Sequence, residues 1–491
     1  MDVVSYIRFS AILSLLLLHT VYANELPNII FAMADDLGWG DVQYNGGNAF
    51  TPNIDKMAQS PNTILLQRYY SGGPRCSPTR GTVLTGRNHN RYCVWSTTGG
   101  TNAPDFTVPE PLALPLTEIT VAEVVREFGY STAMFGKWHL GDFVPITGGN
   151  KKWPVSHPGL HGFDQWWATE RSTPTCTPNC GCFHSICLHG HYPAKETACM
   201  NYHTNKSDEI LGWPDAVPGD DSDFLWNLSE TFIREQVKSG KPFFLYLPFH
   251  TVHVHYIATE FYRQLYLKKN YSSDQADYYG AISALDVVIG RLRELLEELG
   301  IRNNTMFWFT SDNGPARHTP GVTNGLRGRK SSLFEGGVRV PGMIEWPAVI
   351  RSNQVSRFAV VSSDLLPTVY DILGTKPRDD RPMDGTSILP FLHGTEQSRN
   401  KTISWAFAIP GGDFDGHYNV TIAGDRYKLM AVYGKGEVQH HELYDLVEDL
   451  GETKDIAQDY PDITTQLLAQ AEQWRSSVIN SVHKLGCLNS D

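Results

Sequence analysis

The chain contains four short, continuously apolar segments, and polar or charged residues follow each of them. These segments are residues 28–34, 131–135, 242–247 and 306–310. Apolar runs of this length, without alternation, are typical of strands buried on both faces of a parallel sheet. Between residues 278 and 299, apolar residues recur at spacings of three and four, which predicts an amphipathic helix. Strands that alternate with helices indicate an α/β fold with a mostly parallel central sheet and helices on both faces.

The pattern changes after about residue 400. Alternating apolar and polar residues in 402–407, 418–423 and 427–433 predict a small antiparallel sheet. Residues 463–478 have the periodicity of a final helix. We therefore expect a large domain of residues 24–399 and a small C-terminal domain of residues 400–491.

The first 23 residues are predicted to be a signal peptide. Arg8 precedes an apolar stretch, residues 9–18, that is too short to span a bilayer, and small residues follow up to a cleavage site after Ala23. No later run is apolar enough to anchor the chain, so we expect no membrane span. The mature protein is expected in the secretory pathway, either secreted or lysosomal, where disulfides form.

The composition is that of an acidic globular protein. Of its 491 residues 41% are hydrophobic and 19% are charged, and the net charge is −12. This excess of acidic residues argues against non-specific binding of nucleic acid, so an anionic ligand would need a local group of cations. The composition is compatible with a homo-oligomer but does not fix the oligomeric state.

Five of the eight cysteines lie in one stretch, residues 176–199, beside several histidines. In an exported protein this grouping favours disulfides over a zinc site. Six N-x-S/T sequons predict surface positions that suit glycosylation. Their asparagines are Asn205, Asn227, Asn270, Asn303, Asn400 and Asn419.

Side chains with oxygen ligands follow two of the predicted strands. Asp35 and Asp36 come directly after residues 28–34, and Asp312 and Asn313 follow residues 306–310. Ligands of open α/β sheets bind at the carboxyl ends of the strands. Adjacent carboxylates need a cation between them, and a set of oxygen ligands suits Ca²⁺ or Mg²⁺ better than zinc. We favour one calcium ion, and a pair of solvated turn acids is the alternative explanation of Asp35 and Asp36.

Residues 71–91 place a cysteine at the start of a predicted short helix. Glycine and proline residues precede Cys76, and Ser77 followed by Pro78 predicts an N-cap and a first helical position. Cys76 would then lie at the positive end of the helix, with Arg80 about one turn further along. Such a place can hold an oxyanion beside a reactive side chain. A disulfide cysteine before a capped helix is the alternative.

Five motifs occur in the same order as in the type I sulfatases, and the chain is similar to the animal arylsulfatase A and B type over most of its length. They are DDLGWGD at 35–41, CSPTR at 76–80, GKWHLG at 136–141, SDNG at 311–314 and LRGRKSSLFEGGVRVP at 326–341. The resemblance implies an alkaline-phosphatase-like fold and a sulfuric ester hydrolase that acts on aryl or carbohydrate sulfates. It also implies that a formylglycine-generating enzyme oxidises Cys76 to formylglycine (3-oxoalanine).

The resemblance further implies which residues bind the calcium ion. These ligands are Asp35, Asp36, Asp312, Asn313 and the modified Cys76. The hydrated aldehyde would attack sulfur with one hydroxyl group, and the other would allow sulfate to be expelled by C–O cleavage. Asp312 would accept the proton of the nucleophile.

Cations and histidines of the motifs would handle the sulfate. The resemblance implies that Arg80 and Lys137 steady the hydrate and the sulfate, and that His139 acts on the second hydroxyl group. Lys330 and a histidine from residues 250–255 would bind sulfate and protonate the leaving group.

Three histidines are candidates for binding sulfate and protonating the leaving group. His253, within Val252–Val254, fits the family pattern best, while His250, also a candidate substrate ligand, and His255 are alternatives.

For several residues a structural or surface role is the alternative to a role in the site. Lys330 lies in a basic run with Arg327 and Arg329, and basic runs are usually solvated. His139 has the surroundings of a core histidine. Asp286 and Glu294, on the predicted long helix, are expected to be surface charges.

Residues 153–223 show little periodicity and are expected to form long loops that shape the pocket. Two other functions fit parts of the sequence: a phosphatase or phosphodiesterase of the same superfamily, and a non-catalytic binder of sulfated polysaccharide in the extracellular matrix.

Overall fold

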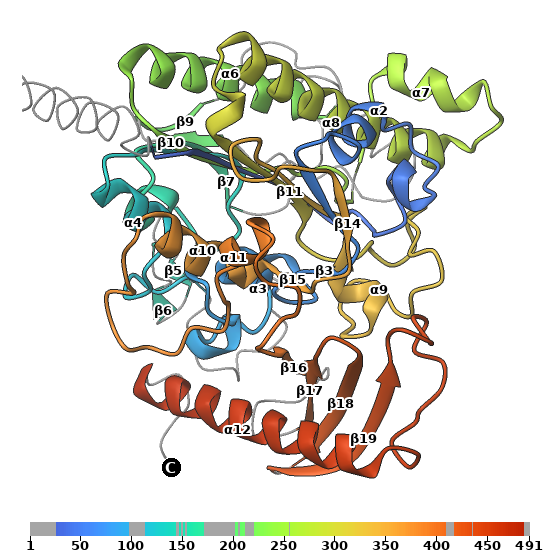
Figure 1. Cartoon of the computed structure of the whole chain (residues 1–491). Coiled ribbons are helices and arrows are strands. Elements are labelled where there is room, and N and C mark those ends of the chain that lie inside the picture. The colour runs from blue at the N-terminus through green and yellow to red at the C-terminus, as the bar shows by residue number, and fades with distance from the viewer. Residues whose placement is uncertain are drawn as a thin grey trace, which may run out of the picture.

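A ten-stranded sheet forms the centre of the molecule (Figure 1). The computed structural model describes residues 26–97, 113–143, 147–148, 151–152, 155–170, 202–204, 207–211, 220–254, 256–408, 417–434 and 436–485. The strands lie in the order β14-β2-β13-β11-β1-β10-β4-β7-β8-β9. Their bounds are β1 Asn28–Ala34, β2 Thr63–Leu66, β4 Ser131–Lys137, β7 Gln165–Thr169, β8 Tyr202–Thr204, β9 Ser207–Leu211, β10 Phe243–Pro248, β11 Thr305–Ser311, β13 Gly342–Glu345 and β14 Gln354–Ser356.

The middle of this sheet is parallel. β11, β1, β10, β4 and β7 pair in parallel, whereas β13, β8 and β9 run antiparallel to their neighbours. The predicted mostly parallel sheet is therefore confirmed, and the four predicted apolar segments lie in β1, β4, β10 and β11. Residues 165–169, which we expected within loops, form β7 beside β4.

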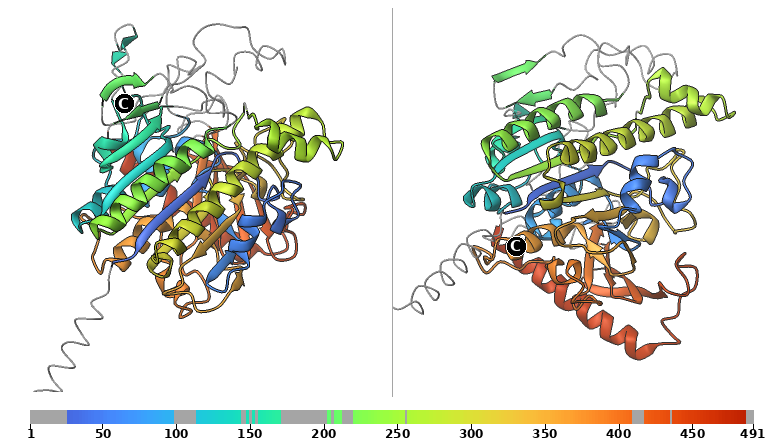
Figure 2. Two further views of the ribbon diagram at one scale, coloured as in Figure 1. Left: turned by 90° about the horizontal axis from the view of Figure 1, so that it is seen from above. Right: turned by 45° about the horizontal axis from the view of Figure 1, so that its top comes forward.

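Helices cover both faces of the sheet, as predicted (Figure 2). Successive β1 residues point to opposite faces, so Ile29 and Phe31 join one apolar core while Ile30 and Ala32 join the other. The first core contains side chains of α3 (Cys76–Thr85), α4 (Val121–Glu127), α10 (Leu365–Ile372) and α11 (Leu389–Leu392). The second contains side chains of α2 (Pro52–Ala58), α6 (Ser222–Ser239), α7 (Glu260–Leu267) and α8 (Ser273–Glu298).

The predicted long helix is α8, but the prediction that both of its acidic residues are surface charges was wrong for one of them. Glu294 is exposed as expected, whereas Asp286 is buried. Its carboxylate accepts hydrogen bonds from the backbone N–H groups of Asn53 (2.9 Å) and Ile54 (2.7 Å), at the start of α2. Asp286 therefore supplies an acceptor to N–H groups that have no partner within α2.

The C-terminal sheet is antiparallel, in the order β16-β17-β18-β19, and α12 packs on it (Figure 1). Its elements are β16 Ile403–Ala408, β17 His417–Ala423, β18 Tyr427–Gly434, β19 Glu437–Asp445 and α12 Pro461–Leu485. The smaller elements are β3 Tyr69–Tyr70, β12 Arg339–Val340 and β15 Val360–Val361, which form a three-stranded sheet, the pair β5 Thr147–Gly148 and β6 Lys151–Lys152, and α9 Glu335–Val338.

Buried charges join this C-terminal sheet to the segment 326–340. Lys428 of β18 is fully buried and contacts Glu335 and Glu452, each at 2.9 Å. Arg327 donates to the Glu452 carbonyl and to the Tyr444 hydroxyl, both at 2.9 Å. We call this group of five residues the C-terminal clamp. It fixes both ends of the short stretch that carries Lys330.

The sequence analysis also made predictions about glycosylation sites, cysteines and membrane spans. Among the sequons, Asn227, Asn270, Asn303 and Asn400 are exposed. The side chains of Asn205 and Asn419, the cysteine-rich residues 176–199, the signal peptide and His255 lie outside the described residues. Cys93 is disulfide-bonded, and Cys76 is a free thiol. Within the described part of the chain, no helix combines the length and apolar character needed to cross a membrane.

Candidate active site

The carboxyl ends of β1 and β11 bring three aspartates together. Ala34 pairs with Ser311 at the end of these strands, so Asp35 and Asp36 emerge beside Asp312. The Asp36 backbone N–H donates to Asp312 Oδ1 at 3.1 Å. All three carboxylates are buried. The predicted convergence of two chain segments at this edge is therefore present in the structure.

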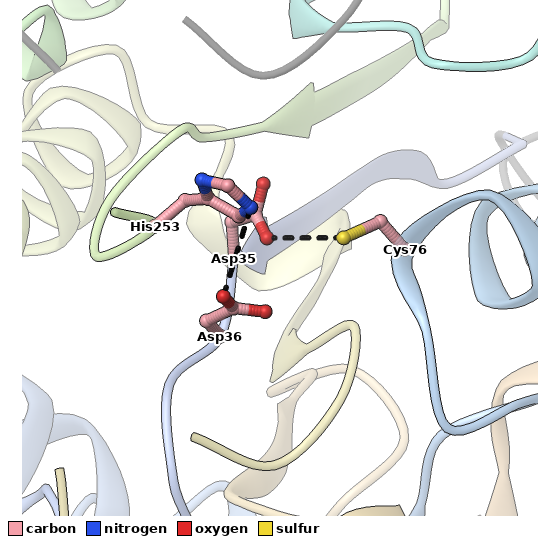
Figure 3. A group of neighbouring side chains, drawn as sticks. All are labelled: Asp35, Asp36, Cys76 and His253. Atoms are coloured by element: carbon pink, nitrogen blue, oxygen red, sulfur yellow. Dashed lines mark hydrogen bonds and ion pairs between the residues drawn. The ribbon is translucent and has the colours of Figure 1, made fainter. Parts of the chain in front are cut away.

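Cys76 lies at the start of a buried helix and points toward Asp35 (Figure 3). Its Sγ is 3.5 Å from Asp35 Oδ1. The helix begins earlier than predicted: Arg75 is the N-cap, so Cys76 and not Pro78 is the first helical residue. Pro78 is tolerated at the third position because N–H groups of the first turn have no intrahelical acceptor. Cys76 thus lies in the first turn, where the helix dipole favours negative charge.

Three cations surround the three carboxylates. Arg80 donates to Asp35 Oδ2 at 3.2 Å and to Asp312 Oδ2 at 2.8 Å. Lys137, the last residue of β4, also contacts Asp35, and its carbonyl accepts a 2.6 Å hydrogen bond from Arg80. Burial without such pairing would be costly for every one of these charges.

Lys330 is the third cation of the group. Its Nζ lies 2.6 Å from Asp36 Oδ1 and 3.4 Å from Cys76 Sγ. The alternative that Lys330 belongs to a solvated basic face does not fit this placement, because the side chain is only 16% exposed.

The buried charges change the acidities within the site. Burial raises the pKa of Asp35, but Lys137 and the other neighbouring cations outweigh this and hold it well below its usual range. Burial and the adjacent Asp35 raise the pKa of Asp312. Burial and Asp35 raise the pKa of the Cys76 thiol to about 12. An unmodified Cys76 is therefore a protonated thiol at neutral pH and a poor nucleophile.

His253 and His139 complete the site. His253 Nε2 lies 3.8 Å from Asp36 Oδ2, and the side chain is 15% exposed (Figure 3). Burial, Lys330 and Lys137 lower its pKa to about 4. His139 is buried with a φ of 54°. Burial, Lys137 and Arg80 lower its pKa well below the usual value.

His250 lies in a separate hydrogen-bonded group. Its Nδ1 is 2.5 Å from Asp221 Oδ2 and its Nε2 is 2.7 Å from Thr169 Oγ1. The imidazole has no exposed surface, and both of its nitrogens are engaged. The structure therefore does not place His250 where a substrate ligand would lie. Asp221 and Thr169, which the sequence did not single out, hold it between α6 and β7.

The donor atoms fit a hard cation. The Asn313 side-chain N–H group donates to Asp36 Oδ1 at 2.6 Å, whereas its Oδ1 is buried without a hydrogen-bond partner. A buried carbonyl oxygen in that condition suits a metal ligand. Ligand atoms of Asp35, Asp36, Cys76 and His253 all lie within 4.8 Å of one another.

The loop that carries the first two aspartates is anchored by Asp41, which sequence reasoning quoted only as part of a motif. Its carboxylate accepts from the N–H groups of Gly38 (2.7 Å) and Val322 (2.8 Å) and from the Tyr278 hydroxyl (2.8 Å). Burial raises its pKa to about 6. Asp41 thus links the turn after β1 to the segment that follows Asp312.

Comparisons with known proteins agree with this arrangement. A family profile described as Sulfatase matches residues 27–375, and one described as N-sulphoglucosamine sulphohydrolase, C-terminal, matches residues 329–477. The chain is 32% identical to N-acetylgalactosamine-6-sulfatase of Mus musculus, over 78% of this chain and 69% of that protein. It is 29% identical to arylsulfatase A of Bos taurus, over 94% and 89%. The crystal structure of Ps i-CgsB matches with a TM-score of 0.76 at 25% identity, over 92% and 93%.

Proposed function

Because the chain belongs to the sulfatase family and is a sulfuric ester hydrolase, we propose that it works through a formylglycine made from Cys76 and one bound calcium ion. The observation that carries the proposal is the meeting of Cys76 with three aspartates and three cations at one edge of the sheet. Asp35, Asp36, Asp312, Asn313 and residue 76 would hold the ion.

The formylglycine and the calcium ion would together supply the nucleophile that a protonated Cys76 thiol cannot provide. A hydrated formylglycine offers a hydroxyl nucleophile, and a divalent cation stabilises its deprotonated form. The raised pKa of the Cys76 thiol supports a modified nucleophile, because an unmodified thiol here would stay protonated. The chain's own contribution is to bury the residue and to surround it with fixed charges.

The cations would bind the sulfate group. Lys137 contacts Asp35, Lys330 contacts Asp36 and lies 3.4 Å from Cys76 Sγ, and Arg80 contacts Asp35 and Asp312. Charges that are already in place need no reorganisation when negative charge moves in the transition state.

His253 would protonate the leaving oxygen. Its imidazole is the partly exposed one of the two at the site, so a substrate can reach it. A bound sulfate would add negative charge beside the ring and raise its pKa, which favours the protonated form. His139, which is buried and has Lys137 and Arg80 as charged neighbours, would accept the proton of the second hydroxyl group of residue 76.

We further propose a carbohydrate sulfate as the substrate and the secretory pathway, ending in lysosomes or outside the cell, as the location. The relatives named for N-acetylgalactosamine-6-sulfate support this substrate class. A formylglycine-generating enzyme would act on the chain during maturation.

Mass spectrometry across residue 76, combined with an ester assay, tests the proposal. Formylglycine at this position makes the peptide about 18 Da lighter than cysteine would, as follows from the oxidation chemistry. We expect this mass, together with turnover of an aryl sulfate and much weaker turnover of the matching aryl phosphate. Cys76→Ala is the control and should be inactive. An unmodified Cys76 in an active enzyme, or a preference for phosphate, would overturn the proposal.

A further inference from the structure

Two arginines beside the active site have no acidic partner among the described residues. Arg75 directly precedes Cys76 and is half-buried. Its guanidinium donates to two hydroxyl groups, those of Ser331 and Ser96, each at 2.9 Å. It also lies over the ring of Phe407, 5.1 Å from the centroid. Arg317 is exposed and forms no ion pair within the described part of the chain. Both charges are therefore available to an anion.

Backbone hydrogen bonds hold the segments that carry Arg75 and Arg317 against residues 330–331. The Ser331 N–H donates to the Pro74 carbonyl at 2.9 Å, and the Lys330 N–H donates to the Pro315 carbonyl at 3.1 Å. Arg75 and Arg317 therefore come from two segments that are each hydrogen-bonded to the stretch 330–331. Arg317 is also one of the charged groups that interact electrostatically with the Arg75 guanidinium.

The remaining cations of the site differ from these two. Arg80, Lys137 and Lys330 each contact an aspartate carboxylate. Two like charges with no counter-ion repel each other, and an anion bound between them removes that repulsion. Guanidinium groups suit carboxylate and sulfate because their planar N–H donors match two oxygens at once. In a chain of net charge −12, such a pair is a local feature.

We propose that Arg75 and Arg317 form a subsite for a second anionic group of the substrate, a carboxylate or sulfate on the sugar next to the sulfate that meets residue 76. This inference rests on the proposed function and narrows its substrate class to polyanionic glycans. Phe407, which belongs to β16 of the C-terminal sheet, supports Arg75 in the subsite.

Competitive inhibition of aryl sulfate hydrolysis tests the subsite. The probes are a disaccharide of a uronic acid and a sulfated hexosamine, and its uronate methyl ester, which lacks the second negative charge. We expect the acid to inhibit the natural chain at least tenfold more strongly than the ester, which corresponds to about 1.4 kcal/mol. Inhibition constants do not depend on the fraction of enzyme that carries the modification, so a change of occupancy next to Cys76 does not disturb the comparison.

Variants assign the preference to the two arginines. Arg317→Gln and Arg75→Gln should each reduce the acid-to-ester preference about three- to tenfold, and the double variant should bring it close to one. Arg351→Gln, an exposed arginine remote in sequence from both segments, should keep the preference of the natural chain. Equal inhibition by acid and ester in the natural chain, or an unchanged preference in Arg317→Gln, would overturn the subsite. Absence of any aryl sulfate hydrolysis would instead overturn the proposed function.

Discussion

Lys330 Nζ lies 3.4 Å from Cys76 Sγ, although 254 residues separate the two in the sequence. The same ammonium group contacts Asp36 at 2.6 Å. One lysine therefore joins the residue proposed as nucleophile to a proposed metal ligand, and its charge lies where negative charge would develop on a bound sulfate.

Replacing Lys330 by methionine should strongly reduce catalysis. Removal of one preorganised charge from such a site typically lowers kcat by a factor of about 10²–10³. We expect a loss of this size in kcat/KM for an aryl sulfate, with rates corrected for formylglycine content by mass spectrometry. Lys376→Met, at an exposed position, is the matched control. Retention of more than about a third of the activity in Lys330→Met would contradict the role given to this lysine.

The two described histidines after β10 should behave differently. His253→Asn should lower kcat about 10²–10⁴-fold, the usual contribution of a positioned general acid, and should leave the melting temperature little changed. His250→Ala removes the partner of both Asp221 and Thr169, so we expect mainly a loss of stability, about 1–3 kcal/mol. Activity assays and thermal unfolding on both variants separate the roles. Equal effects on kcat in the two variants would speak against this division.

Removal of the proposed calcium ion should destabilise the protein. Asp35, Asp36 and Asp312 are buried beside one another, and the Asn313 carbonyl oxygen has no hydrogen-bond partner. A calcium ion present at about a hundred times its Kd would add about 2.7 kcal/mol to the free energy of unfolding. We expect EGTA to lower the melting temperature and added Ca²⁺ to restore it.

Asn313→Ala is the control for that experiment, since the shift caused by EGTA should be much smaller in this variant. No response of the natural chain to chelation and metal addition would count against a calcium site.

Asp286 should contribute to stability and Glu294 should not, although they lie on the same helix. Asp286→Ala leaves the Asn53 and Ile54 N–H groups without their acceptor, which should cost about 1–3 kcal/mol at pH 5. Glu294→Ala, at an exposed position, should stay within about 0.5 kcal/mol. Urea unfolding measures both.

The contribution of Asp286 should also depend on pH. Burial raises its pKa from 3.8 to about 6, so the folded chain binds this proton more tightly than the unfolded chain. The resulting stability is fully present below about pH 4 and is lost as the pH rises through 6. The difference in unfolding free energy between the natural chain and Asp286→Ala should therefore be smaller at pH 7.5 than at pH 5. A difference that grows with pH would refute the assigned protonation.

Much of the central sheet and of the site could be predicted because the signals are local. Each buried strand is a continuous apolar run, and the polar residues after it necessarily meet at one edge of a parallel sheet. The predicted and observed strands differ by at most two residues at their ends, as for residues 131–135 and β4 (Ser131–Lys137). The start of α3 was misplaced because Ser77 and Pro78 suit an N-cap and a first helical position, whereas here they are the second and third residues of the helix.

The predictions that failed depended on distant partners. Nothing near Asp286 in the sequence indicates that its carboxylate is buried and accepts a hydrogen bond from the Asn53 N–H group, 233 residues away. The sequence left the choice between His250 and His253 open because both follow the same strand, and the contact of His250 with Asp221, 29 residues away, is not visible in the sequence. β7 was missed because residues 165–169 lie in a stretch without regular periodicity, and its pairing with β4 defines it as a strand.

Because of the C-terminal clamp, the position of Lys330 at the candidate active site also depends on residues beyond 400. Lys428 and Glu452 lie beyond residue 400, yet through Glu335 and Arg327 they secure the stretch on which Lys330 is mounted. An expression fragment that stops after the large domain would leave Arg327 and Glu335 without the partners that Tyr444, Glu452 and Lys428 supply. We therefore expect a substitution that removes Lys428 or Glu452 to reduce activity through the position of Lys330, although neither residue lies at the site.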